Sequence, residues 1–123
     1  MATGRDRHDA YLAALAALGR DLARRARSKC ELTGTAGSLV TIDLEGSDVE
    51  PDLEHVVLVS PHVAEHLAGR NLDEALHYLE QAVWSPEPAV RRAAVRILKQ
   101  VDEPWSRDAI DNARVMDAAV EEA

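Results

Sequence analysis

Two histidines one helical turn apart have the clearest chemical potential in this chain. The segment His62-Val63-Ala64-Glu65-His66 has the spacing H-x-x-E-H, in which histidines at i and i+4 bind a metal ion and the glutamate acts as base. Zinc in such proteases needs a further protein ligand, and the known folds are much larger than a chain of 123 residues. The motif therefore does not predict a protease.

A simpler metal site is the alternative that these histidines leave open. Cys30 or His55 could join His62 and His66, because thiolate and imidazole are ligands that suit zinc. The competing interpretation is two solvated histidines on a short helix beside Glu65. We predict no bound metal and no cofactor, with Cys30, His62 and His66 as the alternative zinc site.

No catalytic set is evident elsewhere. Cys30 is the single cysteine, and as a nucleophile it would need a nearby base, although its neighbours Arg27 and Lys29 would lower its pKa. The acidic segment 45–54 lacks the spacing of a calcium loop, so it is predicted to be a solvated loop. We predict no catalytic residue, and the lack of such a set favours a protein that is not an enzyme.

Composition predicts one small acidic domain spanning residues 1–123. The net charge is −8, hydrophobic residues make up 46% and aromatic residues 3%, so Ala, Leu and Val must build the core. Residues 1–29 carry +4 and the rest of the chain is acidic, which argues against a broad nucleic-acid surface, including one through Arg92, Arg96 and Lys99. A single cysteine and no apolar run of ~18 residues predict a cytoplasmic protein outside the membrane.

Hydrophobic periodicity predicts a mainly helical α+β fold. Apolar residues at spacings of three and four predict a long N-terminal helix, and β-branched alternation predicts a small hairpin. Ser60 and Pro61 form a helix start, since Ser is a good N-cap and Pro suits the first helical position. The predicted elements are a helix at about 6–28, a hairpin at about 38–60, and helices at about 61–68, 72–83, 86–101 and 105–120.

The two tryptophans, Trp84 and Trp105, are the candidate anchors of a protein interface. Both are also candidates for the core, because the chain has few other large side chains to fill it. We predict a partner protein or a second copy of the chain as the binding partner.

Three segments, in this order, resemble the N-terminal region of PhnA-type proteins, a family named for alkylphosphonate-utilisation operons. They are residues 27–33 around Cys30-Glu31-Leu32, residues 58–63, and residues 84–90, which read W-S-x-x-P-A-V. The resemblance covers residues 15–120 and implies a zinc ribbon held by four cysteines. Only Cys30 remains here, with Thr33, Ser60 and Val63 at the other three positions.

The resemblance therefore implies a degenerate ribbon without its zinc, held instead by apolar packing. It implies no demonstrated phosphonate chemistry, since the family name records operon association. We predict a non-enzymatic interaction or self-association domain. The alternative is a metal-dependent hydrolytic or phosphonate-related enzyme that uses Cys30, His62 and His66.

Overall fold

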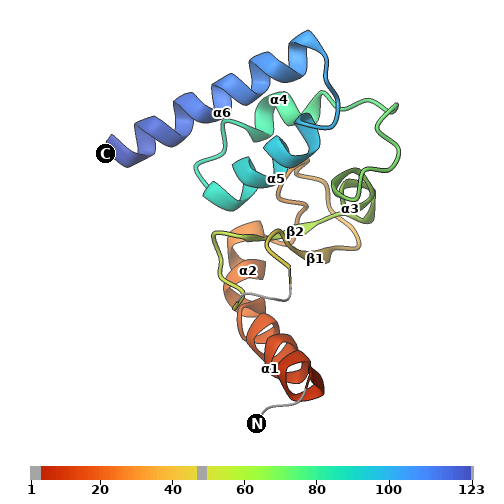
Figure 1. Ribbon diagram of the computed structural model, residues 1–123, viewed down its shortest axis with the longest axis vertical. Helices are drawn as coiled ribbons and strands as arrows, with labels where there is room; N and C mark the ends of the chain where they lie inside the picture. The colour runs from red at the N-terminus through yellow and green to blue at the C-terminus, as the bar shows by residue number, and fades with distance from the viewer. Residues whose placement is uncertain (1–3, 47–49, 123) are drawn as a thin grey trace.

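The fold is α+β and mainly helical, as predicted. The structure is a computed structural model that describes residues 4–46 and 50–122, with the side chains of 120–122 left out. Its elements are α1 (Gly4–Ala17), α2 (Gly19–Ala26), β1 (Val40–Asp43), β2 (Val56–Val59), α3 (Pro61–Leu67), α4 (Tyr78–Ala82), α5 (Pro88–Leu98) and α6 (Pro104–Glu122). In Figure 1, α5 lies between the hairpin and the pair α4 and α6, while α1 and the C-terminal half of α6 project away from this body.

The predicted N-terminal helix is present but bent at Leu18. The Leu18 N–H donates to the Leu15 carbonyl at 3.2 Å, and the helix resumes where the Leu22 N–H donates to the Leu18 carbonyl at 2.9 Å. The predicted apolar stripe is fully buried only in α2, where Leu22 and Ala26 are buried. In α1 no residue is fully buried, and the stripe residues Tyr11 and Leu15 are half-buried.

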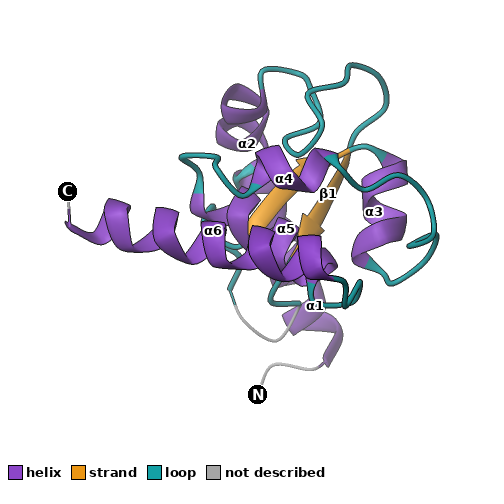
Figure 2. Cartoon of the chain, turned by 90° about the horizontal axis from the view of Figure 1, so that it is seen from above, coloured by secondary structure: helices purple, strands orange, loops and turns teal. Residues whose placement is uncertain are grey.

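The hairpin is antiparallel, with Val40 opposite Val59 and Asp43 opposite Val56. Strand β2 is the buried strand: Val56, Val57 and Val59 are fully inaccessible to solvent. Helices α2, α3 and α5 all contact it, and Figure 2 shows α2 and α3 on opposite sides of the two strands. Two strands alone are marginally stable in water, so this covering by helices is what holds the hairpin.

A buried ion pair joins α2 to the hairpin. Arg25 donates from Nε and Nη2 to the two carboxylate oxygens of Glu31, at 2.7 and 2.9 Å. The same guanidinium donates to the carbonyls of Leu53 and Val56, at 2.6 and 2.7 Å, and Glu31 accepts from the Leu58 N–H at 2.9 Å. All the polar groups of this cluster therefore have partners, which is the condition for placing a charged pair inside a protein.

Helix α5 is the centre of the core. Pro88 occupies its first turn, and the predicted apolar stripe is confirmed by buried Val90, Ala93, Ala94, Ile97 and Leu98. Helix α6 adds buried Ala109 and Ala113. The small side chains allow the helices to pack closely, as expected for a core with few aromatic residues.

One predicted helix is much shorter than its sequence pattern suggests. Residues 72–83 have helical spacing, but α4 covers only Tyr78–Ala82. The chain turns at Asn71, whose φ of 59° lies in the left-handed region, and the Glu74 N–H donates to the Asn71 carbonyl at 3.1 Å. Residues 70–77 therefore form a turn that brings Glu74 toward α3.

The two tryptophans have different environments. Trp84 is 47% exposed, so the core interpretation is wrong for this residue. Trp105 is partly buried against the core, and its indole N–H donates to Glu103 at 2.8 Å. Within the described ranges, every helix is too short or too polar to cross a membrane.

Candidate metal centre

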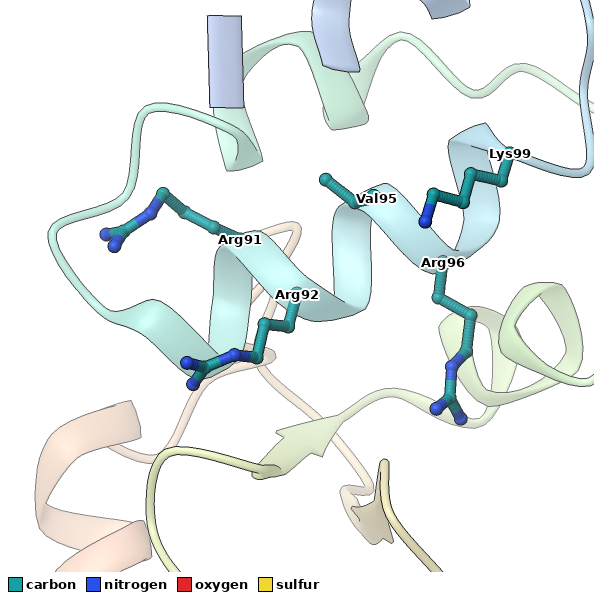
Figure 3. A pocket seen from close by; sticks show the side chains of 5 residues that line it. All are labelled: Arg91, Arg92, Val95, Arg96 and Lys99. Atoms are coloured by element: carbon teal, nitrogen blue, oxygen red, sulfur yellow. The ribbon is translucent and has the colours of Figure 1, made fainter. Parts of the chain in front are cut away.

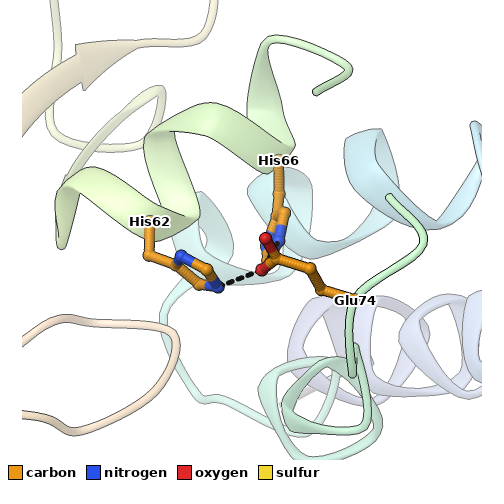
Figure 4. A group of neighbouring side chains, drawn as sticks. All are labelled: His62, His66 and Glu74. Carbon is orange, nitrogen blue, oxygen red and sulfur yellow. Dashed lines mark hydrogen bonds and ion pairs between the residues drawn. The ribbon is translucent and has the colours of Figure 1, made fainter. Parts of the chain in front are cut away.

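The side chains of His62, His66 and Glu74 converge at one point on the surface of α3. One ligand atom of each lies within 4.8 Å of the others, and Figure 4 shows the two imidazoles and the carboxylate pointing toward one another. The Nε2 of His66 is 3.4 Å from Oε2 of Glu74, and His62 Nε2 pairs with the same oxygen. Ligand atoms ~2.0–2.1 Å from a tetrahedral zinc ion lie roughly 3.3 Å apart, and the separation between His66 and Glu74 matches this value.

The local sequence explains how the two histidines meet. The Ser60 side chain accepts from the Val63 N–H at 3.3 Å and Pro61 occupies the first turn, so α3 starts where predicted. Residues at i and i+4 share one face of a helix, and the His62 and His66 rings are 4.7 Å apart between centroids. Helix α3 therefore presents both imidazoles on the side that Glu74 approaches.

The histidines differ in burial, which corrects the interpretation of two solvated residues. The His66 side chain is completely buried, whereas that of His62 is 60% exposed and that of Glu74 is 37% exposed. His66 is buried because α3 packs on α5 and the hairpin. The group thus has one fixed, desolvated ligand and two ligands at its solvent side.

Tyr78 fixes the orientation of the buried histidine. Its hydroxyl lies 2.7 Å from Nδ1 of His66, and a ring that binds metal through Nε2 carries its proton on Nδ1 and donates it. Burial, followed by the negative charges of Cys30 and Glu74, raises the pKa of the Tyr78 hydroxyl. The phenol therefore stays neutral across the physiological range and remains an acceptor for this proton.

The glutamate of the H-x-x-E-H motif does not belong to the group. Glu65 is exposed and forms an ion pair with Arg70. The hydrogen bond from Arg70 keeps the pKa of Glu65 below its usual value. The motif thus supplies two histidines to the site, while its central carboxylate is directed to a surface arginine.

Cys30, the predicted third ligand, lies outside this group of three. It is 1% exposed. Burial raises the pKa of its thiol, but hydrogen bonds from the Thr33 hydroxyl and from the backbone N–H groups of Ser60, Thr33 and Leu32 outweigh burial, and the net pKa is lowered. Cys30, Thr33 and Ser60 are therefore neighbours, and these are three of the four positions to which the PhnA resemblance assigns cysteines.

His55, the other predicted third ligand, belongs to a separate group with Glu45 and Asp52. Its Nε2 lies 2.9 Å from Glu45 and its Nδ1 lies 3.0 Å from Asp52. The hydrogen bond to His55 holds the pKa of Asp52 below its ordinary value. Carboxylates engage both ring nitrogens, so this histidine links the two ends of the hairpin loop.

The basic face of α5 forms a shallow cavity of about 380 Å³, lined by Arg91, Arg92, Val95, Arg96 and Lys99. Figure 3 shows Arg91 and Arg92 extending to one side of the helix, while Arg96 points away from them. Arg92 donates to the Glu54 carbonyl at 2.6 Å and Arg96 donates to the Leu44 carbonyl, so both guanidinium groups are used to hold the hairpin loop. Such an arrangement does not concentrate positive charge as phosphate binding requires.

Sequence reasoning missed Glu74 and Tyr78. Glu74 follows Asn71 by three residues, and this spacing is typical of a capped helix start and not of a ligand. Tyr78 gave no signal, because a lone tyrosine four residues beyond a glutamate is common in helices.

Replacement of Tyr78 by phenylalanine tests its positioning role. We expect Tyr78→Phe to keep the fold and to weaken zinc affinity by about 10- to 100-fold, since outer partners of ligating histidines contribute on this scale. Competition with a chromophoric chelator measures the affinity. The matched control is Tyr11→Phe, which removes a hydroxyl that donates to Asp43 at 2.9 Å outside the site; equal losses in both variants would contradict the role.

Comparisons of the chain with protein-family models, with curated proteins and with solved structures give no significant match, so its function has to be argued from the arrangement of these residues.

Proposed function

We propose that this chain is a zinc-binding protein whose site consists of His62, His66 and Glu74. The observation that supports the proposal most is the convergence of three ligand atoms within 4.8 Å, two from one helix turn and one from the turn at residues 70–77. The buried His66 with its Tyr78 partner supplies the outer hydrogen bond that metal-ligating histidines usually have.

The donor set favours zinc with one open coordination position. Two imidazoles and a carboxylate are the protein ligands of several zinc hydrolases, in which zinc lowers the pKa of a water molecule at the fourth position to about 7. The solvent-exposed side of His62 and Glu74 leaves that direction accessible. The residues of this chain thus support hydrolytic chemistry. Glu74 is the third ligand beside the two histidines, in place of Cys30, which the sequence suggested for that position.

A zinc titration tests the proposal directly. Protein made without an affinity tag and stripped with a chelator is expected to bind one equivalent of Zn²⁺ and to melt at a higher temperature when zinc is present. Zinc at 100 times its Kd stabilises a folded protein by about 2.7 kcal/mol. Parallel titration with Fe²⁺ separates zinc from iron, since two histidines and one carboxylate also bind non-haem iron. Absence of stoichiometric zinc and of any thermal shift would overturn the proposal.

Self-association is a second proposed function. It is favoured by large apolar side chains that are exposed in the isolated chain, among them Leu12 at 47%, Trp84 at 47% and Val115 at 60%. We expect a dimer in sedimentation velocity at micromolar concentration. A monomer at every accessible concentration would contradict self-association and would leave the zinc site untouched.

A further inference from the structure

The C-terminal end of α3 is a hydrogen-bonded cap around Gly69. The Gly69 N–H donates to the carbonyl of His66 at 3.0 Å, and the Arg70 N–H donates to the carbonyl of Glu65 at 2.9 Å. Gly69 has a φ of 84°, in the left-handed region. Two such bonds around a left-handed residue form a Schellman motif, which ends a helix and turns the chain. One of the two acceptors belongs to His66, so this cap is joined directly to a residue of the ligand group.

The side chain of Arg70 reinforces the cap. Its guanidinium forms an ion pair with the Glu65 carboxylate, so the backbone and the side chain of Arg70 both return to the same residue of α3. The pair is exposed, and exposed ion pairs contribute little to stability. The hydrogen-bonded turn at Gly69 is therefore the main element that directs residues 70–77, and Glu65 of the H-x-x-E-H segment holds this turn.

The segment at residues 70–77 is held on both sides of Glu74. Before Glu74, Asn71 is a second left-handed residue, with a φ of 59°, and its carbonyl accepts from the Glu74 N–H at 3.1 Å. After Glu74, the Leu76 side chain is 3% exposed and belongs to the core. Burial of Leu76 fixes one end of the segment, whereas the cap at Gly69 sets the direction from which the chain arrives. The carboxylate of Glu74 reaches α3 because both conditions are met.

A side chain at position 69 is opposed by the backbone more than by its surroundings. A Cβ built on Gly69 lies 2.8 Å from Oε1 of Gln100, but this atom is the end of a flexible, exposed side chain that can move away. The φ of 84° is different, because a residue with a Cβ adopts the left-handed region only at a cost in free energy. Glycine has no such cost, so position 69 favours glycine for its conformation.

We propose that Gly69 is a positioning residue of the zinc site and acts through Glu74. With a Cβ at position 69, the conformation that brings Glu74 to His62 and His66 is populated by a smaller fraction of the molecules. The apparent affinity for zinc falls by the same factor, because zinc then binds a conformation that is only partly populated. This inference rests on the proposed zinc site, and it assigns the placement of the third ligand to one glycine.

Three variants at left-handed glycines test the proposal by chelator competition on tag-free protein. We expect Gly69→Ala to lower zinc affinity by roughly 5- to 30-fold, the factor by which the left-handed conformation is disfavoured for a residue with a Cβ. Gly69→Asn introduces the same Cβ beside Gln100, but asparagine tolerates this conformation, so affinity is expected to stay within about threefold of the wild type. Gly34→Ala is the matched control: Gly34 has a φ of 75° and open space around a built Cβ, and this variant is expected to bind zinc as the wild type does.

A double-mutant cycle with Glu74→Gln separates positioning from a general effect on the fold. If Gly69 acts through Glu74, Gly69→Ala has no further effect on the affinity that remains in the Glu74→Gln variant. Equal affinity of wild type and Gly69→Ala, equal losses in Gly69→Ala and Gly69→Asn, or an undiminished effect in the Glu74→Gln background would each overturn the positioning role and leave the zinc site standing. A wild-type protein that binds no zinc overturns the proposed function, and this inference with it.

Discussion

Replacing Glu74 by glutamine is expected to lower zinc affinity by more than ~100-fold. The amide keeps the size of the side chain but removes the negative charge and leaves a poor ligand. Loss of an outer hydrogen bond alone costs 10- to 100-fold, so loss of a direct ligand costs about this much or more. Isothermal titration or chelator competition on tag-free protein measures the change.

The matched control for Glu74→Gln is Glu80→Gln. Glu80 also faces a histidine, with its carboxylate 3.8 Å from Nδ1 of His77, but the pair is exposed and outside the group of three. We expect Glu80→Gln to bind zinc as the wild type does. Equal zinc binding by wild type and Glu74→Gln would show that the metal is bound elsewhere and would remove the main support for the site.

The largest expected effect on stability comes from Arg25. Truncation to alanine leaves the Glu31 carboxylate, whose side chain is 3% exposed, without its cationic partner, and leaves the carbonyls of Leu53 and Val56 without their donor. Breaking a buried pair by removing one partner costs about 3–5 kcal/mol. Urea unfolding followed by circular dichroism is expected to show this loss for Arg25→Ala.

Two further variants identify the cause. Arg24→Ala removes an exposed arginine of the same helix and is expected to change stability by no more than about 0.5 kcal/mol. The double variant Arg25→Met with Glu31→Gln removes the unpaired charge and keeps an acceptor for the Leu58 N–H, so it is expected to recover part of the loss. If Arg25→Ala cost no more than Arg24→Ala, the pair would not hold α2 to the hairpin.

The fold was predictable from sequence wherever the apolar pattern coincides with the core. The stripe through Val90 and Ile97 and the start at Ser60 and Pro61 were both correct, because burial and capping act locally. The pattern over 72–83 failed since the same leucines can pack from a turn as well as from a helix. The stripe of α1 is covered only in part, because periodicity indicates a face but does not supply the surface that would bury that face.

The site was predictable only in part. His62 and His66 are separated by one helical turn, so their proximity follows from α3 itself. Glu74 reaches them only because the chain turns at Asn71, a left-handed position that a helical spacing does not reveal. Cys30 was a reasonable third ligand by residue type, but no local sequence pattern positions its side chain relative to α3. Its hydrogen-bond partners are instead Thr33 and Ser60.

The position of Glu74 in the turn at residues 70–77 also affects how a metal ion would leave the proposed site. Two ligands lie on a helix packed against the core, and only the third lies on a segment between helices. Opening residues 70–77 would free the ion while α3 and α5 stay in place. Zinc ribbons unfold when they lose their metal, whereas this arrangement predicts an apo-protein that remains folded and binds or releases an ion through movement of this one segment.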